Sequence, residues 1–289
     1  MMKLKISLKN LVKPAPLLVS ALFLFLLSGC SGKIEPTYKE KDIPYLIKKI
    51  CKDEYNLEVT TQRTHNTLWI YAPLNKILHK DYASNEDKIF DDEIMDKIRN
   101  IITTIGRVLI SSDDTPQFFA FLASDIKLGI DYTMIGCVLD IKKSYADFIP
   151  WTEANRRYVI KFKASPEAIG DNTGFHFMAH DIKIEDFLAE QIAQRAGAKF
   201  QDEELKKYFK VEKFDGKFSN GVFYFDYSIT RTAQSPKTID IQDEILDTIT
   251  YCLRTYEFTD FSGIVLTDLK TLDKLELNKK AILSRPNGL

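Results

Sequence analysis

Apolar residues recur at helical spacing in two distant parts of the chain. Residues 43–55 and 184–196 each carry apolar side chains three or four positions apart, which places those side chains on one face of a helix. The first stripe consists of Ile43, Leu46, Ile47, Ile50 and Cys51, and the second of Ile184, Phe187, Leu188 and Ile192. The pattern therefore predicts two amphipathic helices.

A pair of strands follows each predicted helix. Residues 57–64 and 67–73 flank His65-Asn66, and residues 209–218 and 222–230 flank Ser219-Asn220-Gly221. Both connections are short enough for a hairpin turn, and Asn-Gly supplies the positive φ angles that such a turn requires. The sequence thus predicts one hairpin after each helix.

A second helix and a buried strand complete each pattern. The segment DEIMDKI, which starts at Asp92, aligns with DEILDTI, which starts at Asp243, and five of the seven positions are identical. Acidic residues in the first turn favour a helix start through the helix dipole. The apolar runs 118–123 and 261–266 that follow are typical of buried strands.

The repeated order of helix, strand, strand, helix and strand predicts an internal duplication. We expect an α+β fold of two duplicated units, with helices packed on antiparallel or mixed sheets. The first unit spans residues 42–163 and the second spans residues 184–289, with a linker at 164–183.

Part of the first unit has no counterpart in the second. Residues 131–142 predict an added strand, residues 152–157 a short helix and residues 158–163 an exposed strand. The duplicated order is similar to that of small envelope modules such as the BON domain, which occurs in tandem in some lipoproteins. The similarity is limited to the order of elements, so we transfer no activity from it.

The N-terminus has the three parts of an export signal. Four Lys and no acidic residue precede a mostly apolar run, 17–27, which ends in Leu27-Ser28-Gly29-Cys30. The run has eleven residues, fewer than the ~20 that a membrane-spanning helix needs. The tetrapeptide resembles the lipobox of bacterial lipoproteins. An ordinary secretory signal with an accidental Cys is the alternative.

The lipobox resemblance implies where the protein resides. It implies a signal peptide at 1–29 and lipid attachment at Cys30. The polar residues that follow have no apolar period and predict a tether at 30–41. Two or three acyl chains on one Cys hold a protein stably on a bilayer. We therefore expect a lipid-anchored protein of the bacterial cell envelope, and Ser31 after the Cys favours the outer membrane facing the periplasm.

The charge of the chain bears on its partners, and its cysteines bear on disulfide formation and zinc binding. Without the signal, 36 basic residues face 41 acidic ones and no basic block stands out, which argues against nucleic acid as a partner. Cys51, Cys137 and Cys252 lie in apolar settings and predict buried thiols, with a disulfide as the alternative. No two of them have the spacing of zinc ligands.

Candidate catalytic residues are few. His176 and His180 form H-x-x-x-H, which on a helix could bind one metal, but Gly174 and the alternation of Phe175-His176-Phe177 favour a loop or surface position. Asp125 and Asp268 end equivalent strands, where a backbone-capping role is favoured over a catalytic one. The sequence lacks G-x-S-x-G, G-x-G-x-x-G and Walker A motifs, so we expect no cofactor.

Aromatic side chains on the hairpins offer a binding surface. Trp69, Tyr71, Phe223, Tyr224 and Phe225 are expected to be covered, either by helices or by packing of the two units on each other. An outward-facing aromatic in each unit is the alternative. We therefore expect a non-catalytic binding or assembly module of the envelope, with a protein, glycan or lipid partner besides the bilayer. A metal-dependent envelope hydrolase using His176 and His180 is the alternative.

Overall fold

A computed structural model describes residues 37–79, 90–113, 115–233, 235–236 and 238–286. Cys30, the signal segment and most of the tether lie outside the described residues. Residues 38–289 form one compact unit. Among the helices described, none combines the length and apolar character needed to cross a membrane.

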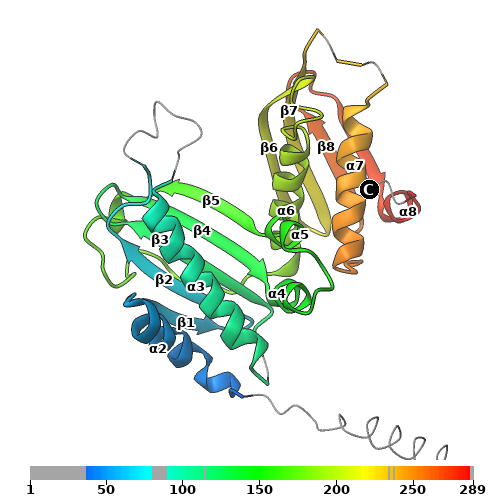
Figure 1. Cartoon of the computed structure of the whole chain (residues 1–289). Coiled ribbons are helices and arrows are strands. Elements are labelled where there is room, and N and C mark those ends of the chain that lie inside the picture. The colour runs from blue at the N-terminus through cyan, green and yellow to red at the C-terminus, as the bar shows by residue number, and fades with distance from the viewer. Residues whose placement is uncertain (1–36, 80–89, 114, 234, 237, 287–289) are drawn as a thin grey trace, which may run out of the picture. The chain divides into compact units, whose positions relative to one another are not determined.

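The first half of the compact unit contains a five-stranded sheet (Figure 1). Strands β1 to β5 lie side by side in chain order; β2 and β3 are parallel, and the other neighbouring pairs are antiparallel. The elements in chain order are η1 (Glu40–Asp42), α2 (Ile43–Tyr55), β1 (Thr60–Thr64), β2 (Thr67–Leu74), α3 (Asp92–Ile110), β3 (Phe118–Asp125), β4 (Ile130–Cys137), α4 (Val138–Tyr145), α5 (Trp151–Asn155), β5 (Val159–Ala164) and η2 (Pro166–Ala168).

The second half contains a four-stranded sheet with the same pairing pattern. Strands β6 to β9 also follow chain order, and β7 and β8 are the parallel pair. The elements are α6 (Ile184–Lys199), β6 (Phe209–Ser219), β7 (Val222–Arg231), α7 (Ile241–Thr255), β8 (Gly263–Asp268), β9 (Lys274–Asn278) and α8 (Lys279–Leu283). The α+β fold with two duplicated units on mixed sheets is confirmed.

The duplicated unit is one strand longer than predicted. In both halves a fourth strand, β4 or β9, pairs antiparallel with the strand that follows the crossover helix. The prediction that residues 131–142 have no counterpart was therefore wrong. β9 escaped prediction because its sequence, KLELN, makes no apolar run, and five residues are too few for its alternation to stand out. The strand prediction also ran too far, since residues 138–142 begin helix α4.

Both hairpin turns form where they were predicted. Asn220 and Gly221 have φ angles of 52° and 77°, the two positive values of a type I′ turn. His65, in the first hairpin, has a φ of 50°. Each turn fixes the register of the two strands that enclose it, and so decides which side chains reach the core.

The two sheets differ in how their faces are covered. Alternate residues of β3 enter two separate cores: Phe119 and Phe121 pack with α2 and α3, while Phe118 packs with α6. Burial on both faces explains why every residue of β3 is buried. In the second sheet, β6 alternates between exposed and half-buried residues, as expected for a strand with one solvated face.

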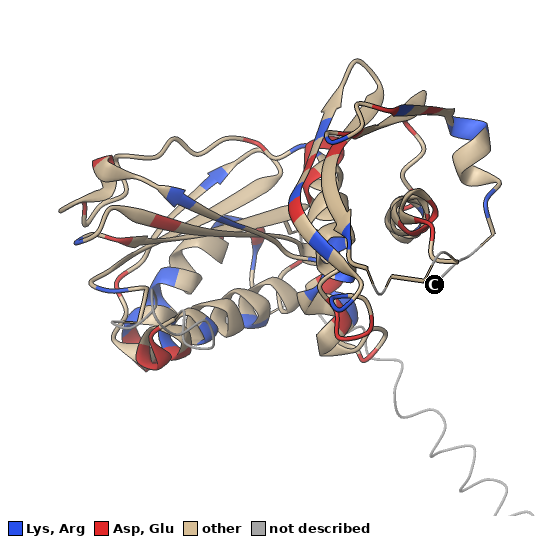
Figure 2. Ribbon diagram, turned by 90° about the horizontal axis from the view of Figure 1, so that it is seen from above, with Lys and Arg blue, Asp and Glu red and all other residues tan. Residues whose placement is uncertain are grey.

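Segment 164–183 lies back on the first sheet. The indole Nε1 of Trp69 donates to the His180 carbonyl at 2.7 Å, and the Tyr71 hydroxyl donates to the Asp171 carbonyl at 2.6 Å. Both aromatic side chains are therefore buried under this segment. Lys and Arg are interspersed with Asp and Glu along the described elements (Figure 2).

Candidate functional site

A cavity of about 400 Å³ runs beside helix α3. The α3 residues that line it are Met95, Ile98, Arg99, Ile102, Thr103 and Gly106. Their spacing of three or four positions places them on one helical face over about three turns. At about 1.5 Å of rise per residue, this face extends about 16 Å. The cavity, called the trough below, is therefore elongated along the helix.

The wall of the trough opposite α3 is formed by β4, α4, α5 and the residue Tyr158. Its residues are Tyr132 and Met134 of β4, Ile141 and Tyr145 of α4, Trp151 and Asn155 of α5, and Tyr158. Most of these side chains are apolar or aromatic. Small-molecule sites are cavities of about 300–1,000 Å³ with mostly apolar walls and a few polar groups. The trough fits this description.

Aromatic side chains surround one end of the trough. The rings of Tyr145 and Trp151 meet edge to face with centroids 4.9 Å apart. Gly106 allows this arrangement, because a Cβ atom at that position would lie 2.9 Å from Cε2 of Tyr145. Tyr145 and Trp151 are 40% and 47% exposed. Exposed aromatic clusters of this kind often mark binding surfaces.

The trough carries little charge. Burial raises the pKa of Tyr132 and of Tyr158 to about 12, and burial also raises the pKa of Tyr145. These hydroxyls are therefore neutral at physiological pH. Arg99 is the one charged residue among the described lining residues, and its guanidinium donates to Asp96 Oδ1 at 2.6 Å on the exposed side of α3.

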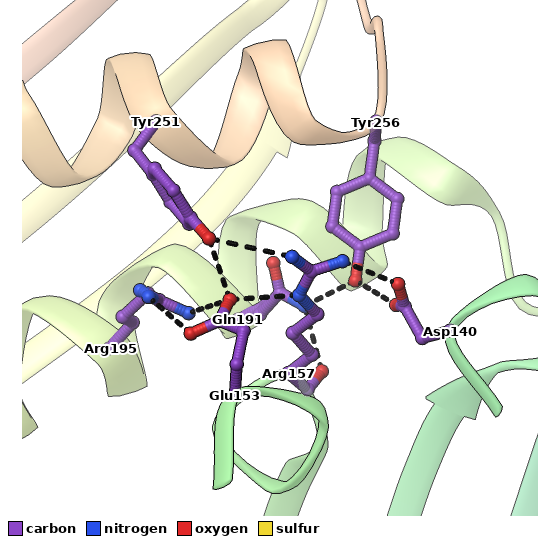
Figure 3. A network of polar contacts seen from close by, with 7 residues as sticks. All are labelled: Asp140, Glu153, Arg157, Gln191, Arg195, Tyr251 and Tyr256. Atoms are coloured by element: carbon purple, nitrogen blue, oxygen red, sulfur yellow. Dashed lines mark hydrogen bonds and ion pairs between the residues drawn. The ribbon is translucent and has the colours of Figure 1, made fainter. Parts of the chain in front are cut away.

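A buried polar network joins the two halves next to the trough (Figure 3). At its centre, Arg157 Nη1 donates to Asp140 Oδ1 at 2.7 Å, and both side chains are less than one-tenth exposed. The Tyr256 hydroxyl donates to the other oxygen of Asp140. Gln191 Nε2 donates to the Arg157 carbonyl and to the Tyr256 hydroxyl, each at 2.7 Å. Residues from α4, from α6 and from just after α7 are thus linked through Arg157 and Asp140.

Glu153 forms the second centre of this network. It accepts from Arg157 Nε at 2.9 Å, from both terminal nitrogens of Arg195 at 2.9 and 3.0 Å, and from the Tyr251 hydroxyl at 2.7 Å. Burial would raise the pKa of Glu153, but these hydrogen bonds outweigh burial and lower the pKa to about 2. Glu153 is therefore ionised throughout the physiological range.

Helix α5 belongs to both the network and the trough. Its residue Glu153 accepts the network hydrogen bonds, while Trp151 and Asn155 line the trough. The helix has only five residues and cannot hold its position through its own hydrogen bonds. Its placement thus depends on the network on one side and on packing against Tyr145 on the other.

The structure places His176 in a buried cluster. Its side chain is 3% exposed; Nδ1 lies 2.7 Å from Asp171 Oδ2, and Nε2 lies 3.4 Å from Asp131 Oδ1 and 3.4 Å from Ser124 Oγ. Ser124, His176 and Asp171 have the order of a catalytic triad. However, Ser124 is fully buried and its hydroxyl donates to Asp131 rather than to the imidazole. The cluster therefore holds the 164–183 segment on the sheet.

His180 lies apart from this cluster, in the same loop. Its ring packs against Trp69 with centroids 5.1 Å apart, and Nδ1 lies 3.4 Å from the Met178 carbonyl. The predicted loop or surface position is confirmed for both histidines, since both lie in the loop, and the His176 ring is buried there. Within the described ranges, no group of three or more His, Cys, Asp or Glu is arranged to hold a metal ion.

The two strand-end aspartates cap the backbone. Asp125 is fully buried and accepts from the amides of Ile77, Lys127 and Leu128 at 2.9–3.1 Å. Asp268 accepts from the amide of Lys270 at 2.8 Å. These contacts bear out the capping role that was favoured over a catalytic one.

The three described cysteines have free, buried thiols, as predicted. Burial raises the pKa of Cys51 and of Cys137 to about 11 and the pKa of Cys252 to about 12. Because the thiolate is the reactive form, these side chains act as small apolar residues at neutral pH.

Comparison of the chain with known proteins found no match. No family model matches it, and no curated protein and no solved structure does so either. The similarity to BON-type modules therefore rests on the order of elements alone.

Sequence reasoning missed both the trough and the polar network. Arg157 ends the polar segment 152–157, which predicts a short helix and gives no sign of a buried charge. Two signals pointed toward the trough: a glycine inside the helical pattern at position 106, and one of only two Trp residues at position 151. Neither signal indicates that the two residues lie near each other.

Proposed function

We propose that the protein is a lipid-anchored lipoprotein of the bacterial cell envelope that binds an apolar group in the trough and has no catalytic role. The observation that carries the binding role is the trough itself, an elongated apolar cavity bordered by the exposed aromatics Tyr145 and Trp151. The anchor rests on the tetrapeptide that ends at Cys30. A binding module on a tether needs both features.

The cluster of Ser124, His176 and Asp171 is not arranged for hydrolysis, which favours a binding role. A serine nucleophile must reach substrate, whereas Ser124 is fully buried and its hydroxyl is bonded to Asp131. The alternative, a metal-dependent hydrolase at His176 and His180, is disfavoured, because both ring nitrogens of His176 already face carboxylate or hydroxyl groups. Metal analysis of the purified protein tests that alternative, and a stoichiometric metal lost in His176→Ala would revive it.

The anchor is tested by Cys30→Ser. In wild-type cells we expect the protein in the membrane fraction, with an acyl-modified N-terminus detected by mass spectrometry. The variant is expected either to leave the membrane fraction or to keep its signal uncleaved. A variant that fractionates and migrates like wild type would remove the anchor from the proposal.

The binding role is tested by crosslinking in intact cells. A photo-crosslinking phenylalanine derivative replaces Trp151, and in a control protein it replaces Tyr45, an aromatic of α2 that is 63% exposed and does not line the trough. We expect a discrete adduct from position 151 that Ile102→Glu abolishes. Equal labelling from the two positions would refute a binding site at the trough.

A further inference from the structure

The shape of the trough restricts what can occupy it. Its α3 face runs from Met95 to Gly106, or about 16 Å at the helical rise. A volume of about 400 Å³ is near the lower limit for small-molecule sites. A small volume spread over that length suits a long, narrow ligand better than a compact one.

The lining chemistry excludes ligands that carry many polar groups. A peptide in the trough would bring backbone N–H and C=O groups, each of which needs a hydrogen-bond partner. The described lining offers few partners: Arg99, Thr103, Asn155 and the tyrosine hydroxyls. Met95 and Met134 add flexible thioether side chains, which adapt to a mobile apolar chain. The trough therefore favours a hydrocarbon chain.

The length agrees with that of a lipid chain. The hydrocarbon core of a bilayer is about 30 Å thick, so one leaflet, the reach of one acyl chain, is about 15 Å. Arg99, the one charged residue of the described lining, is already paired with Asp96 on the exposed side of α3, so the lining sets no charge requirement for a head group. We infer that the trough binds a single linear acyl chain. This inference rests on the proposed function and names its ligand class.

Two sources can supply such a ligand, a free fatty acid or a lysophospholipid, and the experiment separates them. Mature protein from residue 30 onward is titrated, below the micelle concentration, with brominated palmitate or with a lysophosphatidylglycerol that has a brominated chain. Bromine quenches nearby tryptophan. Because Trp151 lines the trough and Trp69 is buried on the opposite face of the sheet, we expect saturable quenching at one ligand per chain. In Trp151→Phe that quenching should be lost, and the tighter of the two probes identifies the source.

A matched pair of variants on one helix tests the location of the site. Ile102→Glu places a charge in the trough and is expected to weaken binding about tenfold or more, since an unpaired buried charge is costly. Ile110→Glu makes the same change on α3 outside the trough, at a residue that is 38% exposed, and should stay within about twofold of wild type. Equal weakening in both variants would overturn the assignment.

Two results would reject the acyl chain itself. The first is the absence of saturable quenching by either monomeric probe. The second is quenching by brominated diacyl vesicles alone, which reports adsorption to a surface. If quenching is absent while position 151 still crosslinks in cells, the acyl inference fails and the proposed binding role stands. If crosslinking is also absent, both fail.

Discussion

Replacement of Arg157 by Met isolates the contribution of the polar network to stability. The guanidinium pairs with Asp140 and Glu153, and its side chain is 7% exposed. Removing one partner of a buried pair costs about 3–5 kcal/mol, because the other charge is left without compensation. Glu153 keeps its bonds from Arg195 and Tyr251, so Asp140 bears most of the loss. We therefore expect a value near the lower limit, about 3 kcal/mol.

The chain offers a matched control in Arg107→Met. Arg107 donates to both carboxylate oxygens of Glu54 at 2.6 and 3.0 Å, but this pair is nearly half exposed. Exposed pairs contribute about 0–1 kcal/mol. Urea unfolding followed by far-UV circular dichroism gives the free energy of unfolding for both variants. Losses of similar size in the two variants would refute the claim that the network stabilises through burial.

A double variant separates the unpaired charge from lost packing. In Arg157→Met with Asp140→Leu, no charge is left on Asp140, and buried ion pairs replaced by apolar groups are often close to neutral. The double variant should therefore recover at least about half of the stability lost in Arg157→Met. A double variant as unstable as the sum of its single changes would show that Asp140 and Arg157 act independently.

Three further outcomes are expected from the same structure. The pKa of Glu153 is 4.5 in the unfolded chain and about 2 in the native chain, so the stabilisation it gives is full above pH 4.5 and is lost as the pH falls toward 2. In urea unfolding, the free energy of unfolding of Glu153→Gln should therefore decline less over that pH range than that of the wild type. Identical declines in the two proteins would count against the assignment. Asp125→Ala should cost about 1–3 kcal/mol by leaving buried amides unsatisfied, against less than about 1 kcal/mol for Asp268→Ala, both from urea midpoints, with similar losses as the contrary result. The three buried thiols should react with a thiol reagent at neutral pH only after denaturation, and rapid labelling of the native protein would show that they are accessible.

Local patterns were sufficient for the duplicated elements. The predicted first helix, 43–55, agrees with α2 at both ends, because its apolar stripe lies at helical spacing and Pro44 stands in the first turn. The Asn220-Gly221 turn was equally direct, since its conformation depends on those two residues alone.

Local patterns failed where burial on a strand or helix was incomplete or mixed. The run from residue 131 to 142 is mostly apolar in its middle, and such a run does not separate a strand from a buried helix, so the start of α4 was read as part of β4. β9 lies at a sheet edge, where few of its side chains are buried. Periodicity reports burial, and an element with little burial gives little signal.

The candidate site could not be predicted because it depends on long-range contacts. Asp140 and Tyr256 are 116 positions apart, and Arg195 and Glu153 are 42 positions apart. A charged residue in a sequence looks the same whether its partner is a buried carboxylate or water. Only the packing of α6 and α7 against the end of the first half turns Arg157 into a buried cation.

Helix α5 couples ligand binding in the trough to the contact between the two halves. One side of this short helix accepts the network bonds at Glu153, and the other presents Trp151 to the trough. Linkage is reciprocal, so if docking of the halves tightens binding in the trough by some factor, an occupied trough tightens docking of the halves by the same factor. In a chain built in this way, filling the cavity and docking the two halves would stabilise each other through one five-residue helix.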